Sequence, residues 1–273
     1  MSDPTLTPPL FAILSTLIEE RVGLCYTLQD KELLESKLSP RAIELGFSSL
    51  LDYYYFLRYD PGGEGEFRAL VSALVVNETY FFRELAPLSV LVEECAALVA
   101  RGRRPRIWCA ACSTGEEPLT FAMLLAAEGL LERVDLIASD VSEGALAKAR
   151  SGQYSRRSLR HTPAPALASK WLDVHERGIS VAPALRDAIR WQQLNLVDDA
   201  AIEALGPVDF ISCRNVLIYF RDALAARVVN RLARALNPGG VLLVGVSESL
   251  LRYGTSLDCE ETKGVFMYRK ARA

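Results

Sequence analysis

This chain of 273 residues has no long apolar run, only two histidines and no glycine-rich phosphate-binding loop. Every apolar run is broken by charge or glycine well before the about 20 residues that a membrane-spanning helix needs. Residues 1–20 lack the basic start and small-residue cleavage site of a signal peptide. We therefore expect a cytoplasmic protein that does not insert into a membrane.

Metal ligands are scarce as well. The only histidines are His161 and His175, and only Cys109 and Cys112 form a C-x-x-C pair. No second pair or neighbouring histidine completes a zinc set, so we expect no metal. Buried, reduced thiols are the favoured interpretation of all six cysteines, because free cysteine is among the most often buried residue types. A redox role for the C-x-x-C pair remains the alternative.

Charge is distributed unevenly along the chain, although the formal net charge is only −3. Residues 1–75 hold six basic and eleven acidic side chains, a net of −5. Residues 144–172, the basic segment, hold no Asp or Glu. Their six basic residues are Lys148, Arg150, Arg156, Arg157, Arg160 and Lys170. Such a segment favours an acidic partner, and a solvated face is the alternative.

Hydrophobic periodicity divides the chain into three parts. Residues 1–75 carry apolar side chains at helical spacing, as in Leu10, Leu14, Leu17 and Ile18, which predicts an N-terminal helical domain. Residues 76–105 are expected to be a linker and a pocket-lining helix. From residue 106 to 273, short apolar runs alternate with helical stretches. This alternation predicts an α/β, doubly wound, mostly parallel sheet, interrupted at about 153–193 by a small inserted β-subdomain.

The loop after the first expected strand, "CSTGEE", indicates which cofactor the sheet binds. In such sheets, ligands bind at the carboxyl ends of the strands. Gly115 would let the backbone approach a ligand, and Glu116 stands at the start of the next helix. A carboxylate there would repel a pyrophosphate, so the loop favours a positively charged cofactor such as S-adenosylmethionine.

Further polar residues end apolar runs. Asp140 follows the strand "VDLIAS" and lies 24 residues beyond Glu116, a position from which acids bind ribose hydroxyls, although a helix cap is the alternative. Thr79 and Asn77 precede three aromatic residues, and capping would also explain them. The arginines of "VVNETYFFRE" and "FISCRNVLIYF" need a carboxylate partner from the protein or a ligand, because an unpaired buried charge is costly.

At these residues the sequence resembles the chemoreceptor glutamate methyltransferases, the CheR family. The matching stretches are "NETYFFRE", "CSTGEEP", "ASDVSEGALAKARSGQY", "QLNLVD", "DFISCRNVLIYF" and "GVSESL", between residues 77 and 250. The helical residues 1–75 resemble the family's amino-terminal domain less specifically. The resemblance implies an S-adenosylmethionine-dependent O-methyltransferase that acts on chemoreceptor cytoplasmic domains and produces S-adenosylhomocysteine.

The resemblance also implies roles for individual residues. It implies a cofactor site of Asn77, Thr79, Arg83, Gly115, Glu116, Asp140, Asn195, Leu196, Arg214 and Asn215. Glu116 would contact the methionine end, Asp140 the ribose, and Asn195 with Leu196 the adenine. Tyr219 would lie near the transferred methyl group, and Arg83 with Tyr219 would position the reactants. Because a glutamate carboxylate is already ionised at neutral pH, the reaction needs orientation and desolvation rather than a general base.

Two departures from the family affect how a substrate would bind. The stretch "DKELLESKLSPRAIELG" interleaves acids with bases where the family usually carries a basic docking helix. "KWLDVHERGISVAPAL" looks shorter than in members that bind a receptor's carboxy-terminal pentapeptide, and it lacks their glycine-rich run. We therefore predict no pentapeptide tether and expect the basic segment to take over part of the docking.

Other functions remain to be weighed against this one. A catalytically silent receptor-binding or scaffold protein on the same fold is one alternative, and a methyltransferase of another substrate is a second. A dehydrogenase would need a G-x-G-x-x-G loop, which is absent. The acidic chain shows no extended basic and aromatic face, so we expect no nucleic-acid partner.

Overall fold

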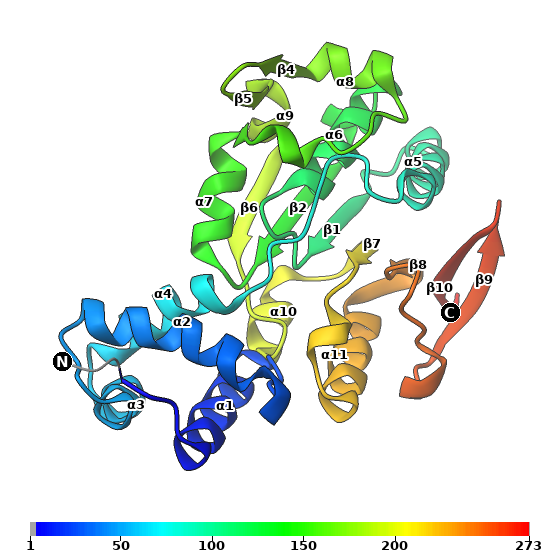
Figure 1. Ribbon diagram of the computed structural model, residues 1–273. Coiled ribbons are helices and arrows are strands. Elements are labelled where there is room, and N and C mark those ends of the chain that lie inside the picture. The colour runs from blue at the N-terminus through cyan, green and yellow to red at the C-terminus, as the bar shows by residue number, and fades with distance from the viewer. Residues whose placement is uncertain (1–3, 273) are drawn as a thin grey trace.

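The computed structural model describes residues 4–272 and begins with a helical domain (Figure 1). The bounds of its helices are α1 Pro8–Val22, α2 Lys31–Glu44, α3 Leu50–Tyr59 and α4 Gly63–Leu74. Leu14, Leu17 and Ile18 of α1 are buried, as the spacing of apolar residues predicts. Ser49 begins α3 by accepting a hydrogen bond from the Leu51 N–H. The helical expectation for this region is confirmed.

A seven-stranded sheet forms the second domain, in the order β6-β2-β1-β7-β8-β10-β9. The bounds are β1 Arg106–Ala110, β2 Asp135–Asp140, β6 Ile189–Gln193, β7 Val208–Cys213, β8 Leu236–Leu243, β9 Leu257–Thr262 and β10 Val265–Lys270. The first five strands of this order pair in parallel, and β10 pairs antiparallel with β8 and β9. The predicted doubly wound, mostly parallel sheet is confirmed.

Helices cover both faces of this sheet. Their bounds are α5 Leu85–Ala100, α6 Glu116–Ala127, α7 Glu143–Ser151, α10 Asp199–Leu205 and α11 Asp222–Ala235. Successive side chains of β1 serve opposite cores: Ile107 packs with α5 and α6, whereas Trp108 packs with α10 and α11. Within residues 4–272, no helix is long and apolar enough to cross a membrane.

A small antiparallel sheet, β3-β5-β4, lies beside α8 and α9 (Figure 1). The bounds are β3 Gln153–Tyr154, α8 Pro165–Trp171, β4 Leu172–His175, β5 Gly178–Val181 and α9 Pro183–Asp187. The expected inserted β-subdomain is therefore present. Its end lies before residue 189, short of the expected residue 193, because β6 pairs with β2 in the main sheet. As an edge strand with polar side chains, "IRWQQ" lacks the apolar run that marks the other parallel strands.

The strand order places a cleft at one edge of the sheet. After β1 the chain adds β2 and β6 on one side, and it then returns to add β7 and β8 on the other. The carboxyl ends of β1 and β7 therefore meet at the topological switch point, where open α/β sheets bind ligands. The segment 76–84 is irregular rather than helical and crosses this edge before α5 begins at Leu85. The expected linker and helix of residues 76–105 are therefore both present, but the linker lines the cavity and α5 does not.

Candidate functional site

A cavity opens at the switch point, between the sheet and the helical domain. Its walls come from the segment 75–83, from the loops after β1, β2, β6 and β7, and from the end of α1. The lining residues that the sequence predicted are Asn77, Thr79, Arg83, Asp140, Asn195, Leu196, Arg214, Asn215 and Tyr219. Residues more than 140 positions apart are thereby brought to one site.

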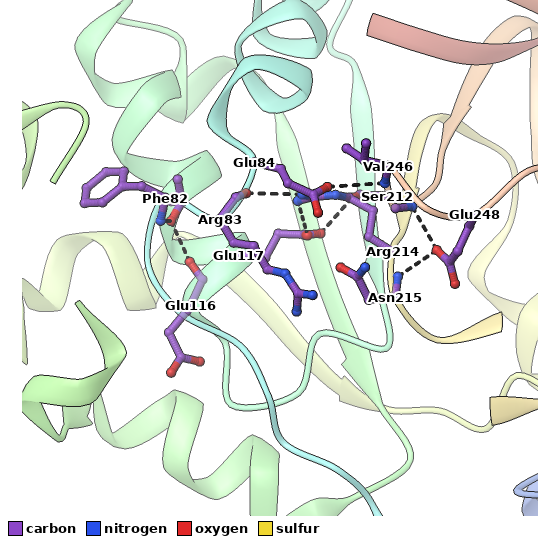
Figure 2. Close-up of polar contacts among 12 residues, drawn as sticks. Phe82, Arg83, Glu84, Glu116, Glu117, Ser212, Arg214, Asn215, Val246 and Glu248 are labelled. Carbon is purple, nitrogen blue, oxygen red and sulfur yellow. Dashed lines mark hydrogen bonds and ion pairs between the residues drawn. The ribbon is translucent and has the colours of Figure 1, made fainter. Parts of the chain in front are cut away.

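Two predicted residues, Gly115 and Glu116, do not line this cavity. Gly115 has a φ of +92° and no room for a side chain, because an added Cβ would lie 2.6 Å from the Ala149 Cβ. The lack of a side chain at Gly115 therefore allows α7 to pack against the loop. The Glu116 carboxylate is buried and accepts a 2.6 Å hydrogen bond from the Thr114 hydroxyl. It extends away from the neighbouring charged residues (Figure 2).

Glu117 takes the place that the sequence interpretation gave to Glu116. It lines the cavity from the first turn of α6, where its Oε2 lies 2.6 Å from Nη1 of Arg214 and its Oε1 accepts a 2.7 Å bond from the Ser212 hydroxyl. Arg214 also contacts Oε2 of Glu84 at 2.7 Å through Nη2 (Figure 2). We call Arg214, Glu84 and Glu117 the buried cluster. Its two carboxylates outnumber its single guanidinium, so it favours a cation beside it.

Arg214 is held in its charged form by this cluster. Its side chain is 1% exposed, and burial disfavours the charge. Glu117 and Glu84 outweigh that effect and raise the Arg214 pKa. Its Nε atom is buried without a hydrogen-bond partner within residues 4–272. Arg214 thus has the carboxylate partners that the sequence predicts for it, and both come from within the protein. Its Nε–H donor remains without an acceptor among the described residues.

Asp140 ends β2 and faces the cavity from the opposite wall. Its Oδ2 accepts a 2.8 Å bond from the Ser113 N–H, and its Oδ1 accepts a 2.9 Å bond from the Ser142 N–H. Burial raises its pKa, and these backbone donors oppose the rise. Asp140 therefore organises two loops. Each carboxylate oxygen can accept a further bond, which leaves it able to bind a ligand hydroxyl.

Tyr219 and Arg83 line the cavity near each other. Burial and the Glu78 charge raise the Tyr219 pKa, and the Arg83 charge opposes the rise. The phenol is therefore protonated at neutral pH and can donate a hydrogen bond. The Arg83 guanidinium donates to the Glu78 carbonyl at 2.7 Å, and within the described residues it makes no ion pair. It is thus free to meet a carboxylate from outside the chain.

The backbone around the cavity is strained. Within residues 4–272, the six non-glycine residues with positive φ are Phe82, Glu84, Ala111, Ser113, Asn215 and Lys263. The first five lie in or next to three of the segments that form the cavity wall. Left-handed conformations cost on the order of 1 kcal/mol each for such residues and concentrate at functional sites. This distribution agrees with a binding site at this edge of the sheet.

The helical domain supplies part of the cavity wall. Val22 and Leu24 line it from the end of α1. Asn195 donates from Nδ2 to the Arg21 carbonyl at 2.7 Å, and the Cys25 N–H donates to the Tyr219 carbonyl at 2.9 Å. The two domains therefore close the site together.

The lining residues suit S-adenosylmethionine better than a pyrophosphate cofactor. The ionisable groups other than thiol and phenol are the carboxylates of Glu78, Glu117 and Asp140 and the guanidiniums of Arg83 and Arg214, a net charge of −1. Carboxylates at the start of α6 and at the end of β2 match a cationic group and a ribose diol. When bound, this cofactor supplies an electrophilic methyl group on a sulfonium.

Metal and redox chemistry find no support in the described residues. Residues 4–272 contain no group of three or more His, Cys, Asp or Glu arranged to hold a metal ion. Cys109 and Cys112 are buried free thiols. Burial and neighbouring carboxylates raise both pKa values well above the ordinary one. A redox pair needs an accessible thiolate, so packing is the better interpretation of these cysteines.

Sequence reasoning missed three residues. Glu117 is adjacent to the predicted Glu116, and the two side chains differ in the direction in which they leave α6. Glu84 itself has a left-handed backbone conformation, and its pairing with Arg214 spans 130 positions. Glu248 binds the loop after β7 from the stretch "GVSESL", whose matching to the family was the one available signal. None of these contacts follows from local periodicity.

The comparisons with known proteins agree with this geometry. "CheR methyltransferase, SAM binding domain" matches residues 77–265, and "CheR methyltransferase, all-alpha domain" matches residues 9–75. Chemotaxis protein methyltransferase 2 of Vibrio cholerae is 36% identical over 92% of this chain and 89% of that protein. Chemotaxis protein methyltransferase 1 of Pseudomonas aeruginosa is 31% identical over 88% of this chain and 90% of that protein.

A third relative carries a different name. Probable biofilm formation methyltransferase WspC of Pseudomonas aeruginosa is 34% identical over 86% of this chain and 56% of that protein. The matches to both domains, together with the negatively charged cavity at the switch point, identify the chain. It belongs to the CheR methyltransferase family and is an S-adenosylmethionine-dependent methyltransferase.

Proposed function

We propose that this enzyme esterifies glutamate side chains of a chemoreceptor, or of a similar signalling protein, in the cytoplasm. The observation that carries the proposal is the lack of a histidine or lysine base among the described residues of the cavity, whose Glu78 carboxylate is paired with Arg160. The lining residues, all within the described part of the chain, include no histidine or lysine. The Tyr219 phenol is held neutral, and Glu117 is paired with Arg214.

A substrate that is already ionised fits such a site. Hydroxyl and amine nucleophiles must lose a proton during methyl transfer, whereas a carboxylate does not. The chain then has to orient the carboxylate and exclude water. Arg83, which forms no ion pair within the described residues, is suited to orient it. The Tyr219 hydroxyl can donate a hydrogen bond beside it.

Exposed arginines beside the cavity support an acidic protein substrate. Arg156 and Arg157 stand on the short 3-10 helix η3, Arg156–Ser158, and neither has an ion-pair partner within residues 4–272. η3 is joined to the cavity-lining segment, because the Phe81 N–H donates to the Ser158 carbonyl at 2.8 Å. Arg160 is partly neutralised by Glu78 at 3.2 Å. The unpaired charge therefore lies close to the cavity mouth.

The basic side chains of α2 also support docking by η3, because they already bond to groups within the helical domain. Lys37 donates to the carbonyls of Ala73 and Leu74 at 2.6 and 3.0 Å. Arg41 pairs with Glu44 and the buried Glu66. Lys31 lies 3.5 Å from Glu35. With these charges used inside the domain, docking by η3 is the better-supported arrangement.

The decisive experiment uses labelled cofactor with receptor cytoplasmic domains from the source organism. We expect label on the receptor that alkali releases as methanol, which identifies an ester. Asp140→Ala serves as a cofactor-binding control, and receptors with Glu→Gln substitutions in the labelled region should accept less label. Label that resists alkali, or cofactor binding without label on any receptor, would favour a different substrate or the silent-scaffold alternative.

We also propose that no receptor pentapeptide tether is used. The small sheet offers only the four-residue β4 and the two-residue β3 as edges for an added peptide, because β5 lies between them. Calorimetry with a receptor's carboxy-terminal pentapeptide should therefore show no binding. Micromolar affinity would contradict this proposal and leave the glutamate esterification untouched.

A further inference from the structure

One carboxylate outside the cavity holds the loop that follows β7. Glu248 lies in the loop after β8 and accepts four backbone hydrogen bonds. Its Oε2 accepts from the N–H groups of Asn215 at 2.7 Å and Gly245 at 2.8 Å. Its Oε1 accepts from Val216 at 3.1 Å and Leu217 at 2.9 Å. Figure 2 shows the Glu248 carboxylate reaching toward Asn215.

The loop held in this way, residues 214–220, forms one wall of the cavity. It contributes Arg214, Asn215 and Tyr219 to the lining. Asn215 has a φ of +56°, a conformation that must be stabilised from outside the residue. Three successive N–H groups that converge on one point form a concave anion site, and Glu248 fills it.

Gly245 shows how closely the two loops fit. A Cβ added there would lie 2.6 Å from Nδ2 of Asn215 and 2.9 Å from Oε2 of Glu248. The Gly245 carbonyl also accepts a 2.8 Å bond from the Glu248 N–H, so the anchor is a tight turn at the end of β8. The sheet therefore sets the position of the carboxylate, and the carboxylate sets the position of the loop.

We propose that Glu248 is a positioning residue for methyl transfer. It does not line the cavity. It acts by holding the backbone that presents Asn215 and Tyr219 to the reactants. A carboxylate meets the requirement because all four groups facing it are donors, whereas an amide would turn one N–H₂ toward a donor. The activity readout below rests on the proposed receptor substrate, and the exchange readout does not.

The test compares Glu248→Gln with Glu261→Gln, which makes the same chemical change at an exposed residue of β9. Hydrogen exchange of the peptide covering residues 213–220 should become about tenfold faster in E248Q, because its N–H groups lose acceptors. The single-turnover rate constant for methyl transfer should fall about 10- to 100-fold, since small displacements of reacting groups have effects of this size. The KM for the receptor should stay within about threefold.

Conservative rescue separates positioning from general stability. Glu248→Asp keeps two acceptor oxygens, so its exchange and rate should lie between those of the wild type and E248Q. If E248Q does not fold, E248D against the wild type carries the same comparison. E261Q should match the wild type in every measurement.

Unchanged exchange at residues 213–220 in E248Q would overturn the proposal. So would a fall in rate that only follows the fraction of unfolded protein. If the wild type methylates no receptor while exchange responds as expected, the receptor substrate is wrong and the role of Glu248 in holding the loop stands.

Discussion

The buried cluster of Arg214, Glu84 and Glu117 and the exposed arginines of η3 use charge in opposite ways. The Arg214 and Glu117 side chains are 1% and 16% exposed and bond each other directly. Arg156 and Arg157 are exposed and have no ion-pair partner within the described residues. Buried charges act over short distances with little screening by salt, whereas exposed charges act weakly over a Debye length. One set can therefore fix a cofactor and the other can guide a large partner.

The largest expected effect is a loss of stability when Arg214 is removed from the buried cluster. Arg214→Ala leaves two carboxylates facing each other and should lower the free energy of unfolding by about 3 kcal/mol. Urea denaturation measures this change, with exposed Arg101→Ala as the control, which should change stability by less than about 0.5 kcal/mol. Equal effects of the two substitutions would show that the cluster is not a buried network.

The next effect distinguishes two adjacent glutamates. Glu117→Gln should weaken S-adenosylmethionine binding about 10- to 100-fold, because it removes a carboxylate from the cavity wall. Glu116→Gln should chiefly lower stability, since its carboxylate bonds Thr114 outside the cavity. Exposed Glu128→Gln, at the end of the same helix, should change neither. Calorimetry that shows the stronger loss of affinity in E116Q would return the role to the residue first chosen from sequence.

Acidification should weaken cofactor binding through Asp140. Burial raises its pKa, so protonation begins at a higher pH than for an ordinary aspartate. The protonated group loses acceptor capacity toward ribose hydroxyls, and affinity should fall about tenfold or more between about pH 7 and about pH 4. Asp140→Asn should bind more weakly at pH 7 and show a flatter profile. A profile as steep in the variant as in the wild type would assign the titration to another group.

A smaller effect is expected at the exposed arginines. Arg156→Glu with Arg157→Glu should raise the KM for the receptor about three- to tenfold at low salt, and the difference should shrink in about 0.5 M salt. Cofactor affinity should not change. Arg101→Glu, before β1 at the amino ends of the strands, is the matched control. A salt-insensitive loss would indicate that η3 is structural.

The smallest effect is expected on α2. Lys31→Ala should change the KM for the receptor by less than about twofold, because the half-buried Lys31 already pairs with Glu35 and leaves no free charge for docking. Steady-state methylation measures this. A loss larger than that of the η3 variants would move the docking site to the helical domain.

Most of the fold could be predicted because local patterns carry it. Leu14, Leu17 and Ile18 recur at helical spacing, and "VDFISC" becomes β7 with every residue buried. β6 was placed in the inserted β-subdomain rather than in the main sheet, because an edge strand with polar side chains lacks the apolar run of the other parallel strands. That the linker 76–84 rather than the following helix lines the cavity could not be predicted, because its shape depends on strained residues such as Phe82 rather than on any repeat.

The sequence predicted which residues line the cavity better than it predicted the direction in which their side chains point. Nine of the eleven chosen residues line the cavity, because strand ends and family motifs mark them. Glu116 and Glu117 could not be separated, since adjacent positions at a helix start differ by about 100° in direction. The partners of Arg214 and Asn215 come from segments 130 and 33 positions away, and contacts of that range are set by packing.

The bonds from Arg21 and Cys25 to the cavity loops bear on how such enzymes can be recombined. Val22 and Leu24 line the same cavity as Asp140, so the helical domain forms part of the cavity wall. Exchanging residues 1–75 between relatives would therefore exchange a cavity wall along with any docking surface. A working chimera has to carry matched residues on both sides of that junction.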